Sequence, residues 1–401
     1  MGFIPEELTA EILAYLDVKT IARLKCVNKS WNALISNPTF VEKHLNKSSQ
    51  NPHLTVLYKY DKDYSLVPIP VRRLLENPSI TIQKEPSHNL EFCYHVAGSC
   101  NGLICLVSDH VYATQHHYRC SFWNPSTGKT YQGLVVLRHD LPRDYVNPPR
   151  DYFNPHSCCR FMFTFGYDDS TRTYKVVAYH VKGDFMNKAS GDSEVKVFSV
   201  GDGDNCWRNI QSFPVIPLDW HYNRYTRANH LNGTINWLAI NKYFHSFYEY
   251  SYITHVEQFV IVSLDLSTET YKQLLLPQGF DKVPIVQPNL NVLKGCLCFS
   301  HDSMETEFVL WQMKEYGVQE SWTRLFKIRN QNLRMHFLPY AFELVCLYIN
   351  GDTVIFANRC SYRAVIYNLR DQRGETTKIT NNIHWFSQAM NYVESLVSVP
   401  W

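Results

Sequence analysis

A turn motif that recurs along the chain limits the possible folds more than any other feature of the sequence. It reads "NPSTGKTY" from residue 124, "DDSTRTY" from residue 168 and "DLSTETY" from residue 265. Asn, Asp, Ser and Thr at such a turn hydrogen-bond to their own backbone, and Thr and Tyr favour the strand that follows. Each copy therefore predicts a β-hairpin, and three copies exceed what chance would place in one chain.

A second kind of hairpin alternates with the first. It has a small or polar turn between apolar runs, as in "SCNGLICL" from residue 99, "HLNGTINWLA" from 230, "LKGCLCFS" from 293 and "YINGDTVIFA" from 348. Asn-Gly between such runs is the strongest short signal for a two-residue hairpin turn. In chain order an inner hairpin is followed each time by an outer one. The inner hairpins are centred near Asn101, Asp168, Asn232, Lys294 and Asn350, and the outer ones near Ser126, Gly201, Ser267, Tyr316 and Arg370.

Five pairs of hairpins with a period of roughly 50 to 70 residues are typical of four-stranded propeller blades. Two other strand-like pieces, "HLTVLYKY" near residue 54 and "YVESLVSVPW" at the C-terminal end, are suited to close a sixth blade by joining the two ends. We therefore expect residues 49–401 to form a large all-β domain, a β-propeller of six blades. A β-sandwich is the alternative.

Residues 1–48 follow a helical periodicity instead. Pro5 suits a first helical turn, and Leu8, Ile12 and Leu16 then recur every four residues. Residues whose side chains can cap a helix precede three further segments, at Asp17, Asn28 and Asn37. We expect an all-α domain of three to four short helices. A domain of this size cannot bury its whole apolar surface, so the excess either binds a partner or docks on the rest of the chain.

The stretch "IPEELTAEILAYLDVKTIARLKCVNKSWNALISNPTFVEKHL", residues 4–45, resembles an F-box of the plant type. Ile4 replaces the usual Leu and Asp17 stands where Pro is common, but Ile keeps the volume and Asp can cap a helix. The resemblance implies that the helices bind a Skp-type adaptor and, through it, the cullin of a ubiquitin ligase. The residues that match the adaptor face and its supporting core are Pro5, Leu8, Ile12, Leu13, Leu24, Val27 and Trp31.

The segment from about residue 98 to 330 resembles the kelch-like F-box-associated interaction domain of plant F-box proteins, a group that includes the S-locus type. "GSCNGLICL", "WNPSTGKTY", "FGYDDSTRTYKVV", "VKVFSV" and "SWTRLF" carry this likeness. The double glycine of kelch repeats and the Trp-Asp of WD repeats are both missing. The resemblance implies a substrate receptor that brings an unidentified target protein to the ligase for ubiquitination and proteasomal degradation.

Two segments rich in aromatic residues and arginine are candidates for target binding. They are "LPRDYVNPPRDYFNPH", residues 141–156, and "LDWHYNRYTRA", residues 218–228. Tyr, Trp and Arg often anchor protein recognition because they bury large areas at modest entropic cost. The candidate residues are Tyr145, Tyr152, Phe153, Trp220, Tyr222 and Arg224. The alternative is that such rings pack between blades.

Other classes of function have little support in the sequence. Lys and Arg number 39 against 37 Asp and Glu, so the charge balance gives no reason to expect binding to nucleic acid or to a membrane. The twelve cysteines lack the spacing of a zinc site, and no nucleophile–base pair, phosphate loop or paired carboxylates stand out. We expect a non-catalytic protein without cofactor or metal, located in the cytoplasm or nucleus.

One alternative function stays open at this point. Aromatic loops also stack on sugars, so the β-domain is also compatible with a propeller lectin or another small-ligand binder, with the F-box as a docking piece.

Overall fold

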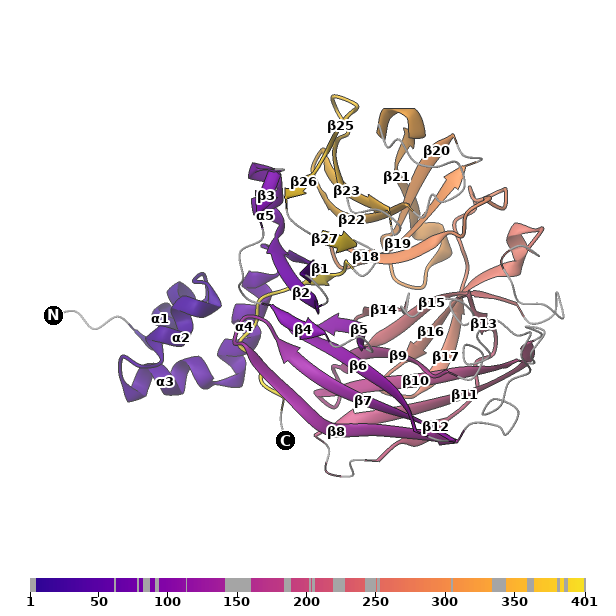
Figure 1. The fold of residues 1–401 in the computed structure, drawn as a ribbon. Helices are drawn as coiled ribbons and strands as arrows, with labels where there is room; N and C mark the ends of the chain where they lie inside the picture. Colours follow the sequence, from indigo (N-terminus) through magenta and orange to yellow (C-terminus); the bar gives the residue numbers. More distant parts are fainter. Residues whose placement is uncertain are drawn as a thin grey trace.

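The computed structural model describes residues 5–60, 63–77, 79–81, 87–90, 94–112, 114–140, 160–183, 189–201, 203, 206–218, 228–241, 250, 253–303, 306–333, 344–358, 364–380, 383–385 and 389–399. Within these ranges a group of four helices precedes six antiparallel sheets, which are arranged around a ring (Figure 1). No helix in the described part of the chain has the length and apolar character needed to cross a membrane.

Polar caps start three of the four N-terminal helices, which are α1 (Glu6–Leu13), α2 (Val18–Leu24), α3 (Lys29–Ser36) and α4 (Pro38–Ser48). In three of them a side-chain Oδ1 accepts a backbone N–H of the first turn: Asp17 from Thr20 at 2.9 Å, Asn28 from Trp31 at 2.8 Å and Asn37 from Thr39 at 2.9 Å. These bonds satisfy donors that a helix start leaves unpaired. The predicted caps are therefore confirmed.

Five of the sheets are built from consecutive strands that pair antiparallel. The first has β5 (Tyr94–Cys100), β6 (Leu103–Tyr112), β7 (Gln115–Asn124) and β8 (Lys129–Asp140); the second has β9 (Met162–Asp168), β10 (Thr173–Gly183), β11 (Ala189–Val200) and β12 (Arg208–Ile210). The third has β13 (Ile216–Pro217), β14 (Asn229–Leu231), β15 (Thr234–Ile240), β16 (Phe259–Asp265) and β17 (Thr270–Leu274). The fourth has β18 (Asn289–Leu293), β19 (Cys296–Ser303), β20 (Glu307–Met313) and β21 (Trp322–Arg329); the fifth has β22 (Leu344–Asn350), β23 (Thr353–Asn358), β24 (Ala364–Asn368) and β25 (Arg373–Thr376). Each contains one predicted pair of hairpins, so that prediction is confirmed.

The sixth sheet joins the two ends of the β-domain. It contains β1 (His53–Tyr60), β2 (Asp63–Pro70) and β4 (His88–Leu90), and β1 also pairs with β27 (Ile383–Trp385) and β28 (Asn391–Tyr392). The predicted closure through "HLTVLYKY" is therefore confirmed, but the C-terminal contribution differs from the prediction. Among the described residues of the C-terminal piece only Tyr392 lies in a strand, together with Asn391 before it, and β27 comes from a segment that the sequence did not single out.

The remaining elements of the described chain are short. They are α5 (Val71–Glu76), the parallel pair β3 (Ser79–Thr81) and β26 (Lys378–Thr380), and the 3-10 helices η4 (Val256–Gln258), η5 (Gln319–Ser321) and η6 (Asn330–Leu333).

The hairpin turns follow the expected chemistry. Three inner turns place two residues at positive φ, as type I′ turns require: Asn101 and Gly102 at 49° and 82°, Asn232 and Gly233 at 46° and 71°, and Lys294 and Gly295 at 51° and 70°. The repeated turn motif is held by the side chains of Asn124, Asp168 and Asp265, whose Oδ1 atoms accept backbone N–H bonds from two and three residues onward. Asn368 does the same in a fourth copy that the sequence pattern did not reveal.

Apolar side chains fill the space between each sheet and the next, and these cores continue around the whole ring. Phe122, Phe163 and Phe165 lie between the sheets of β5–β8 and β9–β12. Leu54, Val56 and Ile69 of the joining sheet pack on Val345 and Ile355 of the β22–β25 sheet. On its other side, Leu57 and Leu66 of the joining sheet pack on Ile104 and Trp123. The sheets are thus blades of a closed six-bladed propeller, and the β-sandwich alternative is wrong.

Candidate functional site

A set of large apolar side chains on the N-terminal helices is left uncovered. Leu8 is 55% exposed, Ile12 is 57% exposed, and Tyr15, just after α1, is 65% exposed. Spacings of four and three residues bring these three to one side of the helix. Val27, in the turn after α2, is 59% exposed. We call these four residues the exposed apolar set; such exposure of large apolar side chains is typical of surfaces that bind a partner.

Beneath this set the helices have a small core of their own. The buried members are Leu13, Ala14, Ile21, Ile35 and Phe40. Leu24 and Trp31 are half-buried and pack against this core. The helices therefore hold their arrangement without burying the exposed apolar set.

The seven predicted adaptor residues fall into two groups. Four are exposed, namely Pro5, Leu8, Ile12 and Val27. The other three, Leu13, Leu24 and Trp31, belong to the core or pack on it, which is the place of a supporting residue. Adaptor binding by these residues stays a prediction. Tyr15 was not predicted, although its position three residues after Ile12 continues the helical spacing.

Charged residues fix α1 and Tyr15 against α4. Glu11 forms ion pairs with Lys43 and Lys47, and these lysines hold the pKa of its carboxyl below the usual value. Lys47 Nζ also donates a hydrogen bond to the Tyr15 hydroxyl at 2.7 Å and lies 4.3 Å from the centre of its ring. The tyrosine is thus presented to solvent in one orientation, beside a positive charge.

A buried histidine ties α4 to the end of α1. His44 Nε2 lies 2.9 Å from the carbonyl oxygen of Leu16, and the His44 ring stacks on Phe40 with ring centres 6.3 Å apart. Burial lowers the pKa of His44, so the ring is neutral at neutral pH. It therefore donates one hydrogen bond within the helical core and has a structural role.

The last described residues attach the helices to the propeller. Leu396 packs against the helical core. Glu394 accepts a hydrogen bond from the Val18 backbone N–H at the start of α2; burial, with Asp17 nearby, nevertheless raises the pKa of its carboxyl. Asn124 Nδ2, at the end of β7, donates to the carbonyl oxygens of Ser395 at 2.9 Å and Val397 at 2.8 Å. Residues 393–399 are therefore a strap that touches both parts of the molecule.

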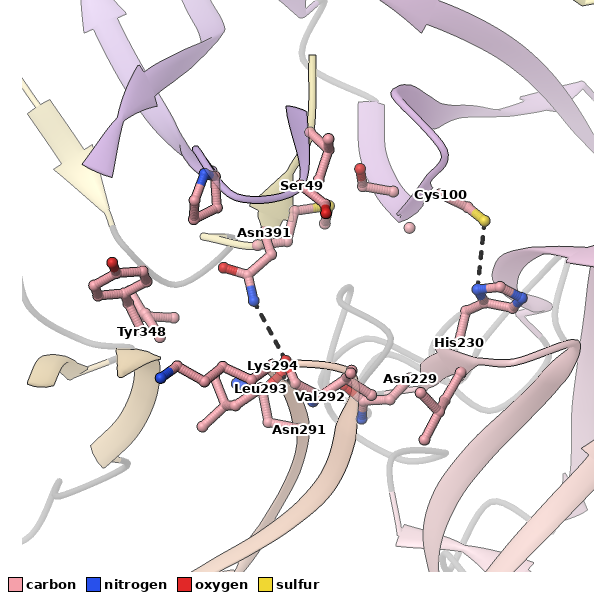
Figure 2. A pocket seen from close by; sticks show the side chains of 18 of the residues that line it. Ser49, Cys100, Asn229, His230, Asn291, Val292, Leu293, Lys294, Tyr348 and Asn391 are labelled. Atoms are coloured by element: carbon pink, nitrogen blue, oxygen red, sulfur yellow. Dashed lines mark hydrogen bonds between the residues drawn. The ribbon is translucent and has the colours of Figure 1, made fainter. Parts of the chain in front are cut away.

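A cavity of about 820 Å³ lies where α4 meets the propeller (Figure 2). Leu45, Asn46, Ser49 and Gln50 of the α4 end line one side, and the inner hairpin turns at Asn101, Asn232, Lys294 and Asn350 line others. Asn391 Nδ2 donates to the carbonyl oxygen of Val292 at 3.3 Å, which links the closing strand to β18. The inner turns of four blades thus converge on the face of the ring that α4 approaches.

The titratable groups of this cavity are not arranged for catalysis. Cys100 Sγ lies 3.3 Å from His230 Nδ1, which suggests a nucleophile beside a base. Burial, however, raises the pKa of the Cys100 thiol well above its usual value and lowers the pKa of His230. His230 Nε2 is also within 3.1 Å of the Tyr167 backbone. The thiol therefore stays protonated. Among the described residues, no three His, Cys, Asp or Glu side chains are grouped to hold a metal ion.

The six predicted target-binding residues, Tyr145, Tyr152, Phe153, Trp220, Tyr222 and Arg224, lie outside the described residues. β6 leaves the inner turn at Leu103, and its far end at Tyr112 is in register with Gln115, which pairs with Asp140. Asp140 thus lies about 30 Å along the blade from the inner turn. Pro217 pairs with Ala239 at the far end of β15.

Family models match both parts of the chain. Residues 56–399 match the F-box associated beta propeller domain, and residues 3–43 match the F-box domain.

Curated relatives of similar length come from Arabidopsis thaliana. An F-box/kelch-repeat protein is 27% identical over 336 residues, covering 81% of this chain and 79% of its own length. The F-box protein CPR1 is 26% identical over 351 residues, covering 82% of this chain and 74% of its own length.

Proposed function

Since the chain belongs to the family of plant F-box proteins with an F-box-associated β-propeller domain, we propose that it is the substrate receptor of a Skp-cullin-F-box ubiquitin ligase. The F-box binds the Skp-type adaptor, and through it the cullin, while the propeller binds a target protein for ubiquitination and degradation. The observation that carries the proposal is the exposed apolar set on helices whose own core is complete without it.

The receptor contributes position rather than a reacting group. Holding a target beside the ubiquitin-conjugating enzyme raises the effective concentration of the target lysine, and no catalytic side chain on this chain is needed. The protonated thiol of Cys100 is in keeping with this role. Such ligases work in the cytoplasm or nucleus, where we place this protein.

The target surface in this proposal is the face of the propeller away from α4. The described strand residues Asp140 and Pro217 lie toward that face, and the aromatic residues and arginines that the sequence singles out come after them in the sequence. Adaptor and target would then bind at opposite ends of the blades. The lectin alternative rests on these same aromatic residues, which lie outside the described residues.

Adaptor binding is the direct test. We expect Leu8→Asp to weaken binding of a Skp-type adaptor by about tenfold or more, because a carboxylate would be buried in an apolar interface. Trp31→Ala should also weaken adaptor binding, because Trp31 packs on the helical core beneath the exposed apolar set. The measurement is calorimetric titration of the purified full chain with adaptor.

The matched control is Ile285→Asp, which changes an equally exposed apolar residue, 68% exposed, on the propeller between β17 and β18. It should bind adaptor like the natural chain. Unchanged affinity in both Leu8→Asp and Trp31→Ala would contradict the proposed function.

A further inference from the structure

We propose that the cavity between α4 and the inner turns binds a small polyhydroxylated molecule of the saccharide class. Its volume of about 820 Å³ is within the range of small-molecule sites in proteins. Figure 2 shows side chains from separate elements converging on it, with Tyr348 and Lys294 on one side, Ser49 and Asn391 on another and His230 opposite.

The lining has the chemistry that hydroxyl groups require. Amide side chains come from the α4 end, from the inner turns and from the closing strand, and no carboxylate is among the described residues that line the cavity. An amide offers both a donor and an acceptor, which suits a hydroxyl group because it is also both. The half-buried ring of Tyr348 adds an apolar wall, against which the C–H face of a sugar ring can pack.

Part of this amide lining is not used by the fold. The side chain of Asn291 already bonds to the protein: its Nδ2 donates to the Cys346 carbonyl at 2.7 Å, and its Oδ1 accepts from the Val292 N–H at 2.8 Å. The side chains of Asn46, Gln50 and Asn232, by contrast, make no hydrogen bond with any described residue. All three are solvent-exposed, so within the described part of the chain nothing prevents them from bonding a ligand.

An anion would be a poorer occupant than a neutral polyol. Among the described residues that line the cavity, the one permanent positive charge is on Lys294, whose exposed side chain is screened by solvent and has its Nζ 3.4 Å from Asn350 Oδ1. Another side is the C-terminal end of α4, and the carbonyl groups at that end of a helix repel negative charge. The balance of charge therefore favours an uncharged ligand.

Such a ligand would touch the F-box and the propeller together. The α4 end belongs to the helical group, and Tyr348 and Asn232 belong to different blades. A molecule that binds only this joined arrangement stabilises it by mass action. Sugar binding should therefore reduce hydrogen exchange in α4.

The test titrates the purified full chain with glucose, sucrose and myo-inositol, with sodium phosphate at matched ionic strength as the anionic probe. Thermal unfolding and calorimetry are the readouts. We expect at least one polyol to raise Tm saturably. Gln50→Ala and Tyr348→Leu should weaken that binding by about three- to tenfold, the loss of one hydrogen bond or one packing contact.

Gln273→Ala is the matched control, since Gln273 is an exposed glutamine of β17 outside the cavity. It should bind like the natural chain. Gln50 is also exposed, so its replacement keeps the fold even if Tyr348→Leu does not. The proposal is overturned if no polyol binds saturably, if Gln50→Ala binds like the natural chain, or if only phosphate binds, in a manner that depends on Lys294.

Discussion

At the scale of single residues, Gly102 links a blade to the strap. Its φ of 82° belongs to the inner turn between β5 and β6, and a Cβ atom there would lie 2.1 Å from the Cβ of Ser395 and 2.9 Å from the carbonyl oxygen of Val393. The strap is therefore pressed onto this turn. The contact is possible because glycine has no side chain.

Gly102→Ala should destabilise the protein by about 3 kcal/mol or more, because the left-handed backbone costs 1–3 kcal/mol for a residue with a Cβ and the clash with Ser395 adds to it. Gly295→Ala is the control, since this glycine has a φ of 70° in the equivalent turn of β18 and β19 and a Cβ there meets nothing within 4 Å. Gly295→Ala should lower the free energy of unfolding only by the cost of the left-handed backbone. Urea unfolding of both variants measures the difference; equal losses would contradict the close contact.

At the scale of elements, a buried ion network joins neighbouring blades. Lys175 of β10 is 5% exposed, and its Nζ donates to the Leu266 carbonyl and lies 3.1 Å from Asp168 and 3.3 Å from Glu269, which is in the turn between β16 and β17. Burial opposes ionisation of Asp168, but hydrogen bonds from Ser170, Thr171 and Lys175 hold its pKa well below the usual value. This lowered pKa stabilises the fold at neutral pH, and that contribution is lost as the pH falls below the usual pKa of Asp.

Lys175→Met should cost about 3–5 kcal/mol of folding free energy, because it leaves the buried Asp168 carboxylate without its cation, whereas Glu269 keeps its ion pair with Arg208. Lys196→Met is the control. It removes a lysine of the adjacent strand that pairs with Glu194 at 2.7 Å near the surface, and should cost less than about 1 kcal/mol. Denaturant unfolding checks both, and a similar small cost for the two variants would argue against a buried network.

The elements differ in how well the sequence predicts them. The Asn-Gly turns and the Asp17, Asn28 and Asn37 caps were predictable because their chemistry lies within a few residues. The strands β27 and β28 were not, because two or three residues carry no periodicity. The contact of Leu396 with the helical core had no local signal either. The seven adaptor residues came from resemblance, and spacing alone left open whether the helices bind outward or pack inward.

At the scale of the whole molecule, the helices pack inward on the propeller and still keep an apolar surface exposed. They dock on the propeller through Leu396 and the α4 end, and they leave the exposed apolar set free. The strap, and not the connection between α4 and β1 alone, therefore determines how the F-box is oriented.

Leu396→Asp should loosen the helices from the propeller without opening the ring, because β28 and its pairing with β1 are untouched. Hydrogen exchange should become faster in α1–α4 and stay slow in the blades. Leu275→Asp, at a residue of the propeller that is 56% exposed, is the control and should change neither. Equal protection of the helices in Leu396→Asp and the natural chain would show that the strap does not hold them.

The pairing of β1 with β28 also has a consequence for biosynthesis and inheritance. A ribosome completes the F-box helices first and delivers β28 after every other described strand, so the sheet that closes the ring is completed after the other five blades. A premature stop codon before Asn391 leaves the F-box helices intact but removes β28 and the strap. Under the proposed function, such an allele should interfere with the products of intact alleles rather than be silent.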